Sequence, residues 1–128
     1  MANALYDSGR NGFLTGAFNW NSDTFKVILL SSTYTVDIAN HVYTSSVGGT
    51  VAISSGIATT TASSGIADAY DITFSSVAGT TATQFVLFHD STKKLIAHFD
   101  TGTNIPVTPN GGDITIQWSD AANKIFKL

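Results

Sequence analysis

The chain has 128 residues, a formal net charge of −3, and no cysteine or glutamate. Charged residues make up 12% of it, about half the share usual for soluble domains, while 14 Ser and 18 Thr fill a quarter of the positions. These values exclude intrinsic disorder, a disulfide framework, a cysteine-based zinc site and the basic surface that binds nucleic acid. No apolar run is long enough to span a membrane. We expect one domain over 1–128, folded in the cytoplasm.

Residues 3–15 are the one stretch expected to form a helix. Its apolar positions lie roughly on one side, and Asn3 or Asp7 is placed to cap a turn. Three glycines at positions 9, 12 and 16 weaken this expectation, because each costs up to about 1 kcal/mol against alanine within a helix. The segment 1–15 is therefore predicted to be a short helix or an arm in front of a β-domain that covers 18–128.

Strand patterns follow this segment. The continuous apolar run of Thr24–Ser31 predicts a buried strand. Residues 34–46 fit a loop and short strands equally well. Thr50–Ser54 and Ile57–Ala62 are expected to be short strands joined by a hairpin turn at Ser55-Gly56. The whole stretch 44–67 is rich in Ser, Thr, Ala and Gly, and is either a mobile loop or flat strands that neighbours shield.

The strongest hairpin signal lies in the second half of the chain. Thr83–Asp90 and Lys94–Asp100 alternate well, and Ser91–Lys93 supplies polar turn residues. Both faces of the pair are partly apolar, which predicts a position in the middle of a sheet or at a subunit contact. The alternating stretch Ala69–Val77 is expected to form a further strand before it.

The C-terminal part contains the clearest turn of the chain. Pro106–Gly112 is a rigid Pro- and Gly-containing loop, Ile114–Trp118 alternates like a half-buried strand, and Ile125–Leu128 is expected to form the last strand. The chain thus contains about eight short strands at spacings near ten residues. This pattern predicts an all-β fold, either an antiparallel β-sandwich or a jelly roll.

Two patterns deserve a test as catalytic or metal sites. Asp100-Thr101-Gly102 is the triplet of aspartic proteases, but only 28 residues follow Asp100, too few to complete a protomer of the retroviral type. His89 and His98 would lie diagonally on one face of the hairpin if its turn centred on Thr92-Lys93. His41 is far away in sequence and zinc takes three or four ligands, so two hydrogen-bonded histidines are the alternative.

The remaining candidates are weaker. Asp68 and Asp71 are close in sequence but need not share a face of a strand, and no calcium-loop, phosphate-loop or Gly-x-Ser-x-Gly pattern occurs. Aromatic residues could form a sugar-stacking platform or belong to the core; they are Trp20, Tyr34, Tyr43, Tyr70 and Trp118. We therefore expect a protein that is not an enzyme and that has no catalytic residue, cofactor or metal.

Several segments carry a resemblance to known proteins. They are Met1–Asp7, Gly9-Arg10, Gly12–Leu14, Trp20, Ser22–Val27 and, with a closer match, Pro106–Trp118 and Ala122–Leu128. In these segments the chain resembles a family of small structural proteins of tailed bacteriophages. The resemblance extends over essentially the whole chain and is weakest in 34–67. The shared residues look like turn and core positions, and the family has no catalytic motif to carry over.

The resemblance implies a virion structural protein, most simply a capsid decoration or cement protein at capsomer junctions on the outer shell. Its partners would be the major capsid protein and further copies of itself, as a homotrimer, and neither nucleic acid nor a membrane. The alternatives are a tail or head–tail component and a carbohydrate-binding β-sandwich used in host adsorption. The apolar N-terminal stretch is the expected arm that reaches a neighbour. The predicted interface residues are Leu5, Tyr6, Phe13, Leu14 and Trp20.

Overall fold

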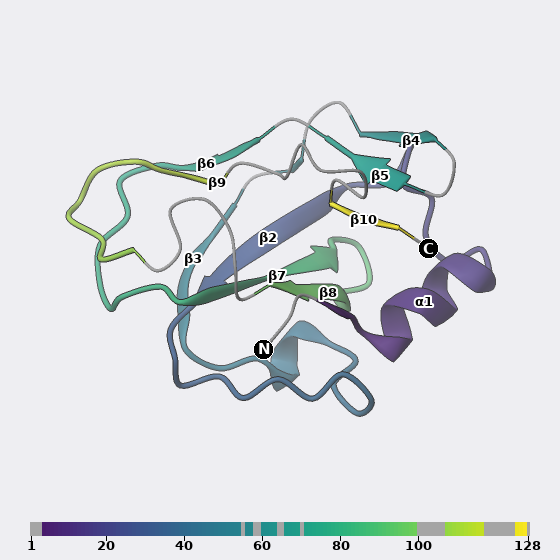
Figure 1. The fold of residues 1–128 in the computed structure, drawn as a ribbon, viewed down its shortest axis with the longest axis horizontal. Helices are drawn as coiled ribbons and strands as arrows, with labels where there is room; N and C mark the ends of the chain where they lie inside the picture. Colours follow the sequence, from purple (N-terminus) through teal and green to yellow (C-terminus); the bar gives the residue numbers. More distant parts are fainter. Residues whose placement is uncertain are drawn as a thin grey trace.

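A computed structural model describes residues 4–54, 56–57, 60–63, 66–69, 71–99, 107–116 and 125–127 (Figure 1). Within these residues the chain forms ten strands, one α-helix and one 3-10 turn. In chain order they are β1 (Ala4–Leu5), α1 (Asp7–Leu14), β2 (Phe25–Leu30), the 3-10 turn η1 (Thr44–Ser46), β3 (Thr50–Ile53), β4 (Thr61–Ser63), β5 (Ile66–Asp68), β6 (Ile72–Phe74), β7 (Gln84–His89), β8 (Lys94–Phe99), β9 (Ile114–Ile116) and β10 (Phe126–Lys127).

All paired strands are antiparallel. They form a five-stranded sheet in the order β1-β8-β7-β2-β3, a three-stranded sheet β10-β5-β4 and a two-stranded sheet β6-β9. The predicted all-β class is confirmed, and eight of the strands have three residues or more. A sandwich or jelly-roll connectivity stays a prediction.

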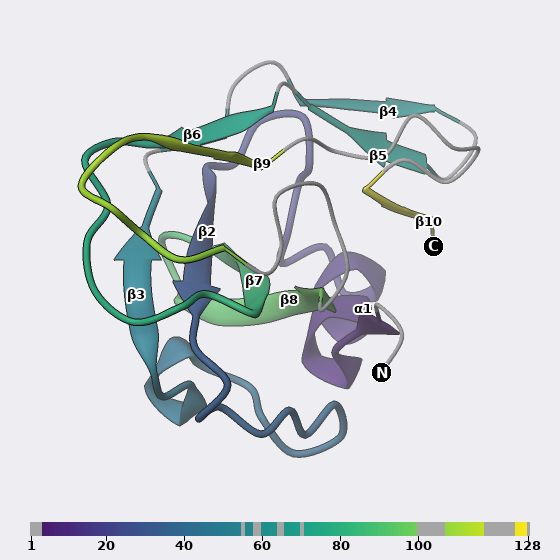
Figure 2. The same cartoon turned by 60° about the vertical axis from the view of Figure 1, so that its left-hand side comes forward.

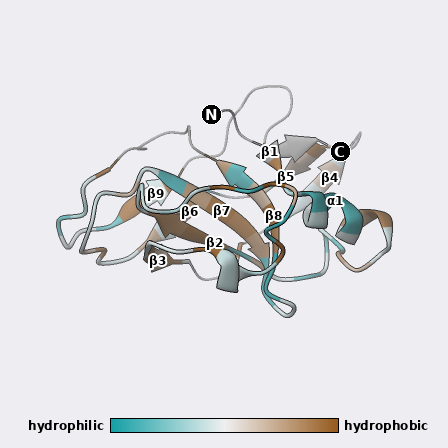
Figure 3. Cartoon of the chain, turned by 90° about the horizontal axis from the view of Figure 1, so that it is seen from below, coloured by the Kyte–Doolittle hydropathy of each residue, from teal (hydrophilic) through white to brown (hydrophobic). Residues whose placement is uncertain are grey.

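The β7–β8 hairpin lies inside the main sheet, which is one of the two positions that its apolar faces predicted. Its turn is Asp90–Lys93, and every residue of β7 is buried. Hydropathy colouring shows the most apolar residues along β2, β7 and β8, whereas α1 is more hydrophilic (Figure 3). Because these strands are buried on both faces, each face needs a cover of its own.

One face of the main sheet packs against the two smaller sheets (Figures 1 and 2). Phe25, Val27 and Leu29 of β2 share a core with alternate residues of β7 and with β5, β6 and β9. The period-two alternation of strands explains why odd-numbered residues of β2 and β7 face this core. The core on this face also contains the following buried residues: Ile72, Phe74, Phe85, Leu87, Ile114 and Ile116.

The opposite face carries a smaller core, which the long segment after β2 covers. Ile28, Leu30, Val86, Phe88 and Leu95 are buried here. Tyr6 and Tyr34 complete the cluster, and Val36, Ile38 and Val47 pack against it from the covering segment. Residues 34–46, which fitted both a loop and short strands, therefore contain the start of a cover over this face of the sheet and include one 3-10 turn.

The hairpin predicted around Ser55-Gly56 is wrong. Past the end of β3 the chain keeps running beside β2, since the Ser54 and Ile57 amides donate to the carbonyl oxygens of Val27 and Phe25, each at 2.8 Å. The next strand, β4, begins only at Thr61 and pairs with β5. Local turn propensity suggested a reversal here, but the hydrogen bonds to the long apolar β2 continue to Ile57.

The predicted helix is shorter than expected and is not a free arm. Residues 4–5 form β1, which pairs with β8, and the helix begins at Asp7. Its glycines allow close packing against the sheet. A Cβ at Gly9 would lie 2.5 Å from the Ile96 carbonyl oxygen, and one at Gly12 would lie 2.1 Å from the Phe18 ring. Two of the three glycines that weakened the helix prediction therefore let the helix pack closely, Gly9 against β8 and Gly12 against Phe18, whereas Gly16 has open space around it.

We expect Gly9→Ala to destabilise the protein by about 1–3 kcal/mol, because the added methyl group meets backbone atoms of β8 that cannot move aside. The matched control is Gly48→Ala, since Gly48 has open space around its Cβ direction and should tolerate the change without loss. Urea unfolding followed by circular dichroism measures both free energies. Equal stability of the two variants would contradict the tight docking of α1.

Candidate functional site

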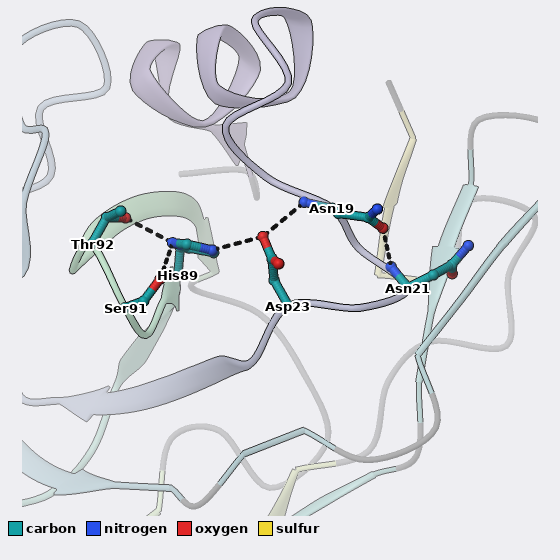
Figure 4. Close-up of polar contacts among 6 residues, drawn as sticks. All are labelled: Asn19, Asn21, Asp23, His89, Ser91 and Thr92. Atoms are coloured by element: carbon teal, nitrogen blue, oxygen red, sulfur yellow. Dashed lines mark hydrogen bonds and ion pairs between the residues drawn. The ribbon is translucent and has the colours of Figure 1, made fainter.

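A cluster of polar side chains of the types that take part in catalysis surrounds His89, the last residue of β7 (Figure 4). Its Nε2 lies 2.9 Å from Oδ2 of Asp23, and its Nδ1 lies 2.7 Å from Oγ1 of Thr92. The Ser91 hydroxyl lies 3.4 Å from the same Nδ1. Because an ionised carboxylate only accepts hydrogen bonds, the Asp23 contact assigns a proton to Nε2. The Thr92 and Ser91 hydroxyls of the hairpin turn are then the hydrogen-bond partners of Nδ1.

Asp23 is held in place by its own loop. The Asn19 amide donates to Asp23 Oδ2 at 2.9 Å, and the Asp23 amide donates to the Asn19 carbonyl oxygen at 2.8 Å. The Asn19 side chain also accepts from the Asn21 amide at 3.1 Å. The Asn19 hydrogen bond, and after it the His89 contact, lower the pKa of the Asp23 carboxyl. The loop is therefore preorganised to present a carboxylate to the hairpin turn.

The imidazole of His89 is also fixed by its ring contacts. Its centroid lies 4.7 Å from the Phe18 ring and 5.4 Å from the Phe25 ring. The side chain is only 3% exposed. With both nitrogens bonded and both flanks packed, this histidine joins the β7–β8 turn to the loop that enters β2. We call this group, consisting of Asp23, His89, Ser91 and Thr92, the His89 clamp.

The His89 clamp has the residue types of a hydrolase triad, a hydroxyl, an imidazole and a carboxylate. Catalysis by such a set needs the hydroxyl to face a bound substrate beside oxyanion donors. Here both hydroxyls belong to the same tight turn as the histidine that they contact. A hollow of about 370 Å³ does occur in the described structure, but other residues line it. The geometry thus supports a cross-link between two loops.

That hollow lies between α1 and the covering segment. It is lined by Asp7, Ser8, Asn11, Gly12, Thr15, Ala39, Val42 and Lys94. The Ser8 hydroxyl already donates to the Leu95 carbonyl oxygen at 3.1 Å, and the hollow is open to solvent and of mixed polarity. It does not combine the hydrophobic enclosure and convergent polar groups of a small-molecule site.

A second polar network lies on the opposite face of the sheet. The Tyr6 and Tyr34 hydroxyls are 2.6 Å apart, and the Tyr34 hydroxyl is 2.8 Å from His41 Nδ1. Burial is the main cause that raises the pKa of both tyrosines. Both hydroxyls therefore stay protonated, and the network ties the covering segment to the residue that follows β1.

Gln84 and His98 extend this network. The side-chain nitrogen Nε2 of Gln84 donates to the carbonyl oxygens of Ser31 and Tyr34, at 2.8 and 2.9 Å. Its Oε1 lies 2.6 Å from His98 Nε2, so that His98 nitrogen is the donor. All of these polar groups sit among apolar side chains, where an unmade hydrogen bond is costly. They hold the chain in one arrangement as it leaves β2.

The diagonal placement of His89 and His98 that a shared metal site would need does not occur, and each histidine is instead hydrogen-bonded to its own partners. β8 contains one extra residue, because Leu87 faces Ala97 while Phe88 faces Leu95. This bulge and the actual register place His98 opposite Val86 and beside Tyr34, whereas His89 packs on Phe18 and Phe25 across the sheet. Within the described residues no group of three His, Cys or acidic side chains could hold a metal ion.

Three of the five predicted interface residues belong to the core of the chain itself. Leu5, Tyr6 and Trp20 are at most 6% exposed, and the Trp20 Nε1–H donates to the carbonyl oxygens of Thr61 and Asp68 at 2.9 and 3.2 Å. Their apolar character therefore reflects core packing. Phe13 is half-buried, and Leu14 is 83% exposed at the end of α1.

Other predicted features are divided between the core and the undescribed part of the chain. Asp100-Thr101-Gly102, Tyr70 and Trp118 lie outside the described residues. Of the described members of the aromatic platform, Trp20 and Tyr34 are buried and Tyr43 is 47% exposed. The described aromatics thus form no stacking surface.

Comparison of the sequence with protein-family models and with curated proteins, and of the structure with solved structures, found no match. Among the helices of the described residues, none has the length and hydropathy to cross a bilayer.

Sequence reasoning missed the partner of His89. Asp23 is 66 residues away along the chain, so no local pattern joins the two. The only sequence signal was the pair of hydroxyl residues that follows His89 in a predicted turn. The Tyr34–His41 contact, at a spacing of seven residues, lay in a stretch of undecided structure.

We expect Thr92→Val to destabilise the protein by about 1–3 kcal/mol, because the nearest partner of a buried imidazole nitrogen is lost. Ser91→Ala is the matched control: Ser91 is an exposed residue and its hydroxyl lies 3.4 Å from Nδ1, so the change should stay within about 0.5 kcal/mol. Thermal and urea unfolding measure both. A larger loss for Ser91→Ala would mean that the turn is organised differently.

Stability should also depend on pH through Asp23. Its folded-state pKa is lowered, so its carboxylate stabilises the fold above the unfolded pKa of about 3.9, and this contribution is lost as the pH falls through the folded value. We expect Asp23→Asn to lower the urea midpoint at pH 7 and to reduce the fall in midpoint between pH 5 and pH 2. An equal fall in urea midpoint between pH 5 and pH 2 for the parent and the variant would contradict the role of Asp23.

Proposed function

We propose that this chain is a structural protein of a tailed-bacteriophage particle, and specifically a capsid decoration protein. It binds the outer shell at junctions between capsomers, as a homotrimer, and stabilises the shell. The resemblance of both ends of the chain to small virion proteins supports the phage assignment. In this proposal its partners are the major capsid protein and further copies of itself, and it performs no catalysis.

The distribution of charge is the observation that carries the assembly part of the proposal. From Ile38 to Ala67 the sequence has 30 consecutive residues without an Asp, Glu, Lys or Arg. Strands β3 and β4 lie within this segment, and all three residues of β4 are exposed. The cores of protein interfaces are depleted of charge in the same way, because burying a charged side chain costs desolvation energy. A neutral surface of Thr, Ser and Ala is suited to being covered.

The interior of the protein supports the same role. The His89 clamp and the tyrosine network hold two long loops on opposite faces of one sheet, so the scaffold presents its surface without rearrangement. Leu14, 83% exposed, projects from the docked helix beside the half-buried Phe13. In the proposal, this end of α1 contacts the shell as a fixed part of the surface, in place of a flexible arm.

Cryo-electron microscopy of the virion that contains this chain tests the proposal. We expect density for the five-stranded sheet on the outside of the head, in three copies around local three-fold positions. A matched particle made without the chain should lack that density and release its genome at a lower temperature. Density in the tail or at the head–tail junction, or no copy in the particle, would overturn the decoration role.

A further inference from the structure

Within the described part of the chain, most strand edges are protected against pairing with another molecule. β1 and β10, which end two of the sheets, have only two residues each. β6 and β9, which form the two-stranded sheet, follow directly after the exposed residues Asp71 and Asp113. Short strands and flanking charges are the usual means by which natural sheets avoid edge-to-edge association.

Two edges, β3 and β4, have no charged residue within or beside them in the sequence. β3 ends the five-stranded sheet and β4 ends the three-stranded sheet, and within the described residues each pairs on one side only. Both lie in the 30-residue segment without a charged residue, which also contains no proline. The end of β3 carries Ile53, which is 58% exposed. An uncharged edge with open backbone groups is a template for strand addition.

The number of open edges indicates the symmetry of the contact. A two-fold contact uses one surface twice, so it needs one unprotected edge. A ring joins two different surfaces of neighbouring copies, so it needs two. Among the described residues two uncharged edges occur, in different sheets, and β3 and β4 lie on different parts of the molecule in both views (Figures 1 and 2).

We propose that β3 of one copy pairs with β4 of the next copy, so that identical chains close into a ring. Each contact adds backbone hydrogen bonds between two neutral strands, and Ile53 becomes covered at the joint. The inference deepens the self-association part of the proposed function by naming the contact. It can be tested on the purified protein, whereas the place in the virion is tested by microscopy, so either can fail alone.

Cysteine cross-linking tests the pairing directly, because the natural sequence has no cysteine. Thr50→Cys and Ala62→Cys place thiols at exposed positions of β3 and β4. With a short bis-maleimide reagent, we expect the double variant to give covalent dimers and trimers on a denaturing gel. A mixture of the two single variants should stop at dimers, and each single variant alone should give none.

Two results would overturn the ring. Self-linking of Thr50→Cys alone would indicate a two-fold contact between β3 strands, and absence of links in the double variant would exclude pairing of these edges. The control pair is Thr50→Cys with Ser75→Cys, since Ser75 is exposed but lies outside both strands. This pair should give no more product than the single variants.

A charge at the open edge provides a second measurement. We expect Ile53→Lys to shift the mass in light scattering to that of one chain, with the circular dichroism of the parent, because Ile53 is largely exposed. Ser45→Lys adds the same charge to the same uncharged segment, but in the exposed 3-10 turn, and should leave the oligomer intact. A parent protein that is monomeric at high concentration would overturn the proposal, as would an unchanged oligomer in Ile53→Lys.

Discussion

Strand β7 is buried along its whole length, and the rest of the fold is arranged to cover it. A strand with two apolar faces needs a layer on each side, and here the layers differ in kind. One is made of the two small sheets, and the other is a long segment with little regular structure. Backbone hydrogen bonds attach the second layer to Asp7, Lys93 and Leu95, and buried side chains hold it to the sheet between these points. This role explains why buried tyrosine, glutamine and histidine side chains gather there.

The two histidines of the hairpin serve the same purpose on opposite faces. His89 joins the turn to the loop before β2, and His98 supports Gln84, which binds the chain as it leaves β2. His89 has a hydrogen-bond partner at each ring nitrogen and His98 has Gln84 at its Nε2, and a hydrogen-bonded buried group adds specificity because another arrangement would leave it unsatisfied. The hydrogen bonds of these two histidines and Gln84 thus fix the positions of the loops on either side of β2.

The distribution of charge along the chain is related to the sheet edges. Charged residues are scarce, and the longest stretch without any of them contains β3 and β4, each of which pairs with one strand among the residues that the structure describes. A monomer that circulates in solution gains solubility from charge and risks aggregation at neutral edges. A chain that works inside an assembly gains the opposite advantage, since its neighbours occupy those edges. The composition and the positions of the edges are therefore consistent with one another.

The sequence by itself determined the all-β class and the β7–β8 hairpin, because alternation and turn propensity are local properties, and it left the place of the hairpin open between the middle of a sheet and a subunit contact. It also indicated the helix, although Gly9 and Gly12 argued against it until the docked sheet explained them. Only the tertiary structure decided the partner of β3, the face of His98 and the burial of Tyr6 and Trp20. These depend on strand register, on one bulged residue in β8 and on contacts between residues far apart in the chain. A one-residue shift of register reverses the face of each following side chain, so local patterns leave such contacts undetermined.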